Sequence, residues 1–206
     1  MSEARIEQAP VQVPAHDSHG HSSAARAENL KFAMWLFIAS EVIIFTVLIA
    51  TYILFRINHP EVVKDVHEVS GILLVSVNTF LLLASSWTMV MGLMAIRRGD
   101  QGGLARWIGF TAILGTIFVA LQMVEYSLLS SEGILLNTEF GMRFYSPTAL
   151  HGVHVVIGVL WALYVIRNAR RGAYSASSNI GVEIFGLYWH FVDVVWIFLF
   201  TIIYLV

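Results

Sequence analysis

The chain has 206 residues, of which 57% are hydrophobic and 13% are charged, and its mean hydropathy is +0.73. This composition is too apolar for an ordinary soluble domain of that length and indicates an integral membrane protein. The absence of cysteine excludes disulfides, thiolate metal sites and cysteine nucleophiles, and a formal net charge of −2 gives no indication of a nucleic-acid partner.

Residues 1–29 are polar and mixed in composition, and they contain His16, His19 and His21 within a short run. No apolar periodicity is present there to build a core, so this segment is expected to be a disordered tail. Weak metal binding by the three histidines is an alternative. No apolar stretch with a small-residue cleavage site begins the chain, and the first hydrophobic segment is therefore expected to direct membrane insertion.

Five apolar segments follow, at about residues 32–55, 71–96, 107–129, 147–166 and 181–206. Each is long enough to cross a bilayer as a helix, for which about 20 residues suffice. Transmembrane β-barrels are built instead from short alternating segments. The sequence therefore predicts an all-α, polytopic membrane protein in which residues 30–206 form a bundle of five transmembrane helices.

Lysine and arginine are unevenly distributed between the two ends of these segments. Most lie at the end shared by the N-terminus, the second loop and the fourth loop: Arg26, Lys31, Arg97, Arg98, Arg106, Arg167, Arg170 and Arg171. The other end has Arg56, Lys64 and Arg143. Because basic residues are enriched on the cytoplasmic side, the tail is predicted to be cytoplasmic and the C-terminus to lie on the outer, periplasmic side.

Small and polar residues recur on single faces of the second and third segments. They are Gly71, Asn78, Ser85 and Gly92 in the second, and Gly115, Gln122 and Glu125 in the third. Such faces let helix backbones approach closely and give buried polar groups partners. For Asn78, Ser85, Ser86 and Gln122 we therefore favour interhelical hydrogen bonds over a role in chemistry.

The last segment carries ionisable residues at membrane depth, where a charge is costly unless it faces protein or water. At helical spacing, Glu183, Gly186, His190 and Asp193 fall on one arc, and apolar residues cover much of the rest. The covering residues are Val194, Ile197, Phe198 and Ile202. The polar arc is expected to meet other helices.

Further ionisable residues are Glu41 in the first segment, Glu125 in the third, and His151 and His154 in the fourth. Glu125, His151 and His154 all lie toward the predicted outer side, where they could form one hydrogen-bonded cluster. Metal binding or axial haem ligation is the alternative. The sequence contains no HExxH helix and no paired ExxH helices, so a structural role is favoured for the cluster.

Several stretches together resemble subunit III of the haem-copper oxidases. They are SEVIIF at 40–45, NTFLLLASS at 78–86, LQMVEYSLL at 121–129, LHGVHVVIG at 150–158 and YWHFVDVVWIFLFTIIYL at 188–205. The match runs in order through all five segments. The resemblance implies an accessory subunit of a proton-translocating terminal oxidase in a bacterial cytoplasmic membrane, with no catalytic, cofactor or metal site of its own.

In that family, subunits I and II carry haem and copper, and subunit III packs against subunit I. The resemblance therefore implies subunits I and II as partners, with a further small subunit and structural phospholipids as additional ones. It also implies support of proton uptake, of the stability of subunit I and of oxygen access. Nitric oxide reductases have closely similar accessory chains, which remain an alternative.

Glu41 is the residue to which a family role transfers most directly. SEVIIF matches the stretch in which the family has a membrane-embedded glutamate that reacts with carbodiimides. A carboxyl group in a dry environment favours its protonated form, which is the form that a carbodiimide attacks. A neutral glutamic acid that is hydrogen-bonded inside the bundle, with no transport role, is the alternative.

The chain departs from the seven-helix members of the family, which have a lipid-filled cleft between the first two helices and the last five, because the leading pair is missing here. Lipid contacts in that cleft do not transfer without a replacement wall, which a neighbouring subunit could supply. The five-helix form is similar to bacterial quinol oxidases and to short cytochrome c oxidases. Two other classes remain open at this point. One is a haem-bearing membrane anchor that uses the histidines, and the other is a self-contained proton or ion carrier that uses Glu41, Glu125 and Asp193.

Overall fold

The computed structural model describes residues 18–60, 72–131, 133 and 136–205. These residues form five long helices: α1 (Ser18–Asn58), α3 (Ile72–Arg97), α4 (Gln101–Ser131), α5 (Glu139–Arg170) and α6 (Ile180–Phe200). A π-helical turn, Thr201–Leu205, continues α6. All five helices are long and apolar enough to cross a membrane. The predicted all-α bundle of five spans is confirmed, and the chain is a multi-pass membrane protein.

The helices extend beyond several of the predicted apolar segments because polar residues at their ends remain helical. α1 begins at Ser18, so residues 18–29 of the predicted tail are helical. Good helix formers such as Ala25, Ala27 and Glu28 favour this continuation. Residues 1–17 lie outside the described residues, and their disorder stays a prediction.

α5 also starts earlier than predicted, at Glu139, with Pro147 inside the helix. Thr138 caps its N-terminus, because its side-chain oxygen accepts a hydrogen bond from the backbone N–H of Gly141. A proline removes one backbone donor, but membrane helices tolerate this where neighbouring groups compensate. The hydropathy of the segment alone therefore placed the start of α5 too late.

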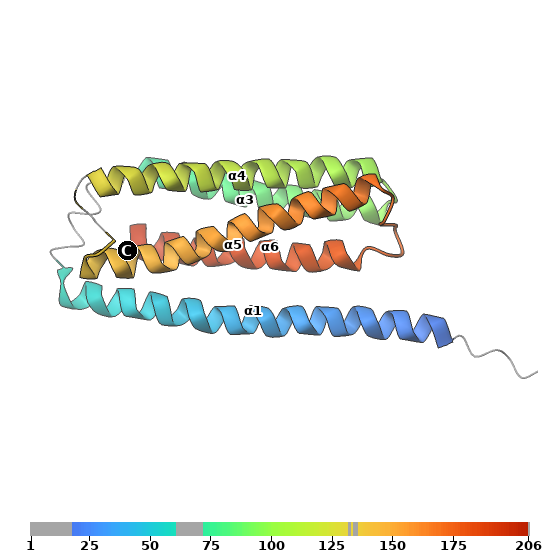
Figure 1. Ribbon diagram of the computed structural model, residues 1–206, viewed down its shortest axis with the longest axis horizontal. Coiled ribbons are helices and arrows are strands. Elements are labelled where there is room, and N and C mark those ends of the chain that lie inside the picture. The colour runs from blue at the N-terminus through green and yellow to red at the C-terminus, as the bar shows by residue number, and fades with distance from the viewer. Residues whose placement is uncertain (1–17, 61–71, 132, 134–135, 206) are drawn as a thin grey trace, which may run out of the picture.

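α6 is the central helix of the bundle, and α1 is a peripheral one. α6 packs against α1, α3 and α5, while α1 packs against α5 and α6. In the most apolar stretch of α6, 56% of the residues are buried, compared with 11% in α1. Figure 1 shows α1 along one side of the bundle and α4 along the opposite side. The helix that carries Glu183, His190 and Asp193 thus lies where other helices surround it.

Trp189 of α6 fills the centre of the bundle because two glycines make room for it. A Cβ atom on Gly115 of α4 or on Gly158 of α5 would lie 2.7 Å from atoms of the Trp189 ring. The indole N–H of Trp189 donates to the hydroxyl oxygen of Ser85 in α3 at 3.0 Å. The predicted faces of small residues are therefore buried packing faces, as Ser85 and Gly115 show.

The alternating directions of the helices bring the basic ends together. The start of α1, the end of α3 and the start of α6 lie at one end of the bundle, and the C-terminus lies at the other (Figure 1). The end of α5 also lies at the same end of the bundle as the start of α1 (Figure 1). This end therefore contains Lys31, Arg97 and the arginines of the last turn of α5, Arg167 and Arg170. The sidedness implied by this distribution stays a prediction.

Candidate functional site

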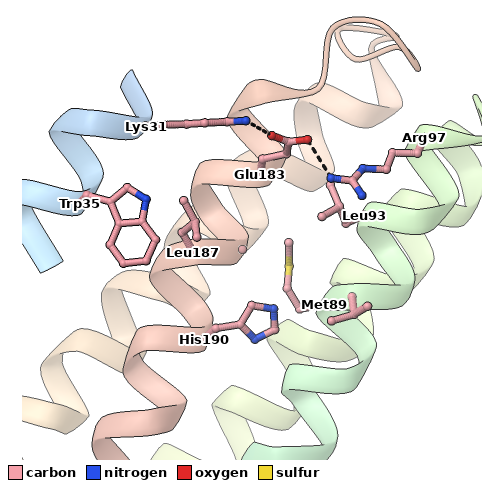
Figure 2. A pocket seen from close by; sticks show the side chains of 10 residues that line it. Lys31, Trp35, Met89, Leu93, Arg97, Glu183, Leu187 and His190 are labelled. Atoms are coloured by element: carbon pink, nitrogen blue, oxygen red, sulfur yellow. Dashed lines mark hydrogen bonds and ion pairs between the residues drawn. The ribbon is translucent and has the colours of Figure 1, made fainter. Parts of the chain in front are cut away.

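Glu183 joins three helices at the basic end of the bundle. Its carboxylate lies 2.7 Å from the Nζ atom of Lys31 in α1 and 3.0 Å from a guanidinium nitrogen of Arg97 in α3. Figure 2 shows the two cations on opposite sides of the carboxylate. Because the Glu183 side chain is only 20% exposed, the partly desolvated carboxylate gains from both partners.

A cavity of about 300 Å³ extends from this ion-pair network along α6. Its walls come from α1, α3 and α6, and His190 lies farther along α6 than Glu183 (Figure 2). The Nδ1 atom of His190 lies 2.6 Å from the hydroxyl oxygen of Ser86 in α3. Asp193, one turn farther along α6, is buried and lies near the same hydroxyl. The predicted polar arc of α6 therefore faces α3, and the predicted covering residues Val194, Ile197 and Phe198 are exposed.

Glu41 of α1 and His154 of α5 form a second polar pair. The Oε2 atom of Glu41 lies 3.3 Å from the Nε2 atom of His154. The Nδ1 atom of His154 lies 2.8 Å from the carbonyl oxygen of Leu150, which can only accept, so Nδ1 carries a proton. The Glu41 side chain is 14% exposed and that of His154 is 9% exposed. The other ring nitrogen, Nε2, therefore faces the Glu41 carboxyl group.

Aromatic side chains surround this pair and keep it in an apolar setting. The ring of Phe45 lies 5.5 Å from that of His154, and Tyr188 stacks on His154 at 6.4 Å. The Tyr188 hydroxyl donates to the carbonyl oxygen of His154 at 2.9 Å. Glu41 thus contacts the bundle through α5 and α6, and its helix otherwise exposes much of its surface.

Glu125 of α4 forms a third group, near the opposite end of the bundle. It is 3% exposed, and the hydroxyl of Tyr204 donates to its Oε1 atom at 2.7 Å. Tyr204 belongs to the π-helical turn, whose carbonyl oxygens also accept hydrogen bonds from α1. Tyr52 donates to Ile203 at 3.4 Å, and Arg56 donates to the preceding carbonyl at 3.2 Å. The π-turn therefore connects α1, α4 and α6.

His151, Gln122 and Asn78 belong to a fourth region, in the fully packed core. The His151 ring stacks on Trp196 at 4.9 Å and meets Phe118 edge-on at 5.6 Å. Within the described part of the chain, its two nitrogens and both amide atoms of Gln122 have no hydrogen-bond partner. Asn78 donates to the carbonyl oxygen of Phe118 at 3.3 Å. Asn78 thus makes the predicted interhelical bond, whereas Gln122 makes none among these residues.

The expectation that Glu125, His151 and His154 form one cluster is wrong, because each side chain has a different partner. Glu125 pairs with Tyr204, His154 pairs with Glu41, and His151 packs on an indole. Among the side chains that the structure describes, no three of His, Asp or Glu lie close enough to hold a metal ion. The sequence-predicted residues therefore lie in separate regions of the bundle and not in one cluster.

Sequence reasoning missed the partners that the aromatic residues provide. Besides Tyr204 and Trp189, the indole N–H of Trp196 donates to the hydroxyl of Thr79 at 2.9 Å. Buried tyrosine and tryptophan usually need a hydrogen-bond partner, and this rule, applied to the last segment, indicates such contacts. Their partners in α3 and α4 could not be chosen without the helix packing.

An apolar groove of about 340 Å³ lies farther along the seam between α1 and α6. Its walls include Val42, Phe45 and Ile49 of α1, with Phe191 and Phe198 of α6. No charged residue lines it. The seam therefore has a charged cavity toward the basic end and an apolar groove beyond it.

Comparison with known proteins gives one consistent result. The family model for cytochrome c oxidase subunit III matches residues 13–206. The cytochrome c oxidase subunit 3 of Synechocystis sp. is 42% identical over 93% of this chain and 79% of its own length. The cytochrome c oxidase subunit 3 of Bacillus subtilis is 34% identical over 86% of each chain. The quinol oxidase subunit 3 of Bacillus subtilis is also 34% identical, over 92% of this chain and 96% of its own.

Proposed function

The chain belongs to the cytochrome c oxidase subunit III family, and from this membership we propose that it is the accessory subunit III of a respiratory haem-copper terminal oxidase. The complex reduces oxygen to water and translocates protons. Subunits I and II carry the haem, the copper and the entry point for electrons, and this chain packs against subunit I without a redox centre of its own.

One observation carries the accessory role: the ionisable groups at membrane depth are used to join helices. Glu41 pairs with α5, Glu125 with the π-turn, and Glu183 with both α1 and α3. Intramembrane charges that pair with each other across helices stabilise a bundle. A catalytic centre would instead need several such groups to converge on one reacting position.

Support of proton uptake is the more specific part of the proposal, and Glu41 is its candidate residue. The carboxyl group lies at the edge of the bundle, at 14% side-chain exposure, 3.3 Å from the Nε2 atom of His154. A carboxyl group and an imidazole at this distance can exchange a proton with little rearrangement. The same position makes Glu41 accessible to an apolar carbodiimide.

Binding of structural phospholipids is a second specific role. The groove between α1 and α6 is apolar, and its size suits a segment of an acyl chain. The groove lies beside exposed residues such as Val42 and Phe198, where either the bilayer or subunit I can border it. Lipid bound there would fill the seam and support the contact of α1 with its neighbours.

We further propose that the chain lies in a bacterial cytoplasmic membrane with its N-terminus in the cytoplasm. The relatives come from bacteria and are named for both cytochrome c and quinol oxidases. The basic helix ends lie together at the N-terminal end of the bundle (Figure 1). The positive-inside rule then places that end in the cytoplasm.

The geometry gives less support to the two alternatives, a haem-bearing membrane anchor and a self-contained proton or ion carrier. A haem anchor needs an axial histidine with open space beside it, but Trp196 and Phe118 fill the space around His151. A self-contained carrier needs a continuous polar path, whereas Glu41, Glu125 and Asp193 have separate neighbours. Neither arrangement favours a second function.

Affinity purification through a tag on this chain, from native membranes in mild detergent, tests the proposal. We expect two larger chains to co-purify, one of them with the optical spectrum of haem and a copper signal. The isolated chain should show no haem absorption and no proton flux in liposomes. Recovery of a stable lone chain with either property would contradict the accessory role.

A further inference from the structure

The cavity between α1, α3 and α6 differs from the rest of the seam in its chemistry. Its charged groups are Lys31 from α1, Arg97 from α3 and Glu183 from α6, and all three meet at the basic end. Two cations and one carboxylate leave a net positive charge there. The side chains of Lys31 and Arg97 are 45% and 57% exposed, so the charged end is open to the surroundings.

From its charged end the cavity extends to a further polar group, the imidazole ring of His190. Met89 and Leu187 form the walls between the ion-pair network and the imidazole ring of His190 (Figure 2). One ring nitrogen is engaged by Ser86 at 2.6 Å, and Asp193 lies behind the same hydroxyl. A titratable side chain therefore lines a cavity whose outer end is charged.

We propose that this cavity is an aqueous vestibule, which binds water and is open at the basic end of the bundle as far as His190. Its volume of about 300 Å³ is roughly ten times the space that a water molecule occupies in the liquid. Water solvates the charged groups at the outer end and supplies a partner for the second nitrogen of His190. The vestibule follows from the packing of α1, α3 and α6 alone. Its presence can therefore be refuted without refuting the proposed oxidase role, and the reverse also holds.

A lipid chain is the competing occupant, because Trp35, Met89, Val90, Leu93 and Leu187 also line the cavity. The four polar side chains in the lining, Lys31, Arg97, Glu183 and His190, argue against it. Glu183 and Arg97 pair with each other, but an acyl chain in this space would exclude water from their ion pair and would offer no partner to the second ring nitrogen of His190. The neighbouring apolar groove offers an acyl chain a better surface. His151 provides the internal contrast, because it is 0% exposed and packed between aromatic rings.

The absence of native cysteine makes the vestibule directly testable. Single variants His190→Cys and Leu187→Cys place a thiol in the cavity, and Leu187→Cys keeps the native histidine. Membrane vesicles that contain the whole complex are treated with a charged, membrane-impermeant thiosulfonate, which reacts with a thiolate in water. Arg171→Cys, in the exposed turn at the end of α5, marks the side of the membrane on which the basic end lies.

The controls are His151→Cys in the packed core and Val194→Cys on the exposed apolar face of α6. We expect loss of the free thiol at positions 187 and 190 only when the reagent is on the side that modifies Arg171→Cys. The thiols at 151 and 194 should remain. No reaction at 187 and 190 from either side, or reaction only from the opposite side, would overturn the proposal. Each variant is scored only in complexes that retain their normal subunit composition.

Discussion

The Nε2 atom of His154 lies 3.3 Å from the Oε2 atom of Glu41, while Nδ1 of the same ring donates to the carbonyl oxygen of Leu150 at 2.8 Å. The Leu150 contact fixes which nitrogen faces the carboxyl group. This contact between Nε2 and the carboxyl group joins α1 to α5.

This arrangement predicts the site of carbodiimide modification. We expect an apolar carbodiimide to label the complex at Glu41, because its carboxyl group is partly exposed at the edge of the bundle. Glu41→Gln should abolish the labelling of this chain, as read by peptide mass spectrometry. Glu125→Gln is the matched control, since Glu125 is only 3% exposed and its carboxyl group accepts a hydrogen bond from Tyr204. A labelled peptide that contains Glu125 in place of Glu41 would refute this assignment.

The packing of Trp189 predicts a difference between two glycines of α4. A Cβ atom at Gly115 would lie 2.7 Å from the Trp189 ring, so Gly115→Ala should destabilise the bundle by about 1–3 kcal/mol. A Cβ atom at Gly109 would meet no neighbouring group within 4 Å, so Gly109→Ala should stabilise the bundle by about 0.5–1 kcal/mol. Thermal unfolding in detergent compares the two midpoints. Equal midpoints would show that Trp189 does not occupy this position.

The hydrogen bond between Tyr204 and Glu125 predicts a cost for removing one hydroxyl group. Tyr204→Phe leaves a buried carboxyl group without its donor and should destabilise by about 1–3 kcal/mol. Tyr164→Phe is the control, because Tyr164 is 60% exposed. Its effect should stay within about 0.5 kcal/mol. Denaturant titrations of the two variants measure the difference, and an unaffected Tyr204→Phe variant would exclude the bond.

His151 is predicted to tolerate an apolar replacement. Phenylalanine keeps the stacking on Trp196 and removes two nitrogens that have no hydrogen-bond partner among the described residues. His151→Phe should therefore equal the native stability or exceed it by about 1–3 kcal/mol. His151→Ala is the matched variant and should be less stable, because it leaves a hole beside Trp196. Loss of assembly or of bound haem in His151→Phe alone would reveal a ligand or partner at this ring.

Hydropathy predicted the five spans, because each apolar segment must face lipid or other helices over the thickness of the membrane. It could not predict where α1 and α5 begin, since residues such as Glu28 and Glu139 are helical outside the apolar stretch. Helix ends depend on local propensity and capping, as Thr138 illustrates.

Residue spacing in the sequence could not predict which polar residues pair with one another. Periodicity placed Glu183 and His190 on one face of α6, but their partners Lys31, Arg97 and Ser86 come from helices far away in the chain. The predicted cluster of Glu125 and His154 does not form although α4 and α5 are neighbours, because Glu125 pairs with Tyr204 and His154 pairs with Glu41. The partner of Glu41 likewise depended on the packing of α1 against α5.

The central claim, that this chain supports an oxidase without performing its chemistry, is tested most directly by turnover of the purified complex with and without the chain. Oxygen consumption and proton release are followed together over many catalytic cycles. The account predicts that the depleted enzyme starts near its normal rate, keeps its haem, and then loses activity early or takes up protons slowly. Simultaneous loss of activity and haem on removal of the chain would contradict it.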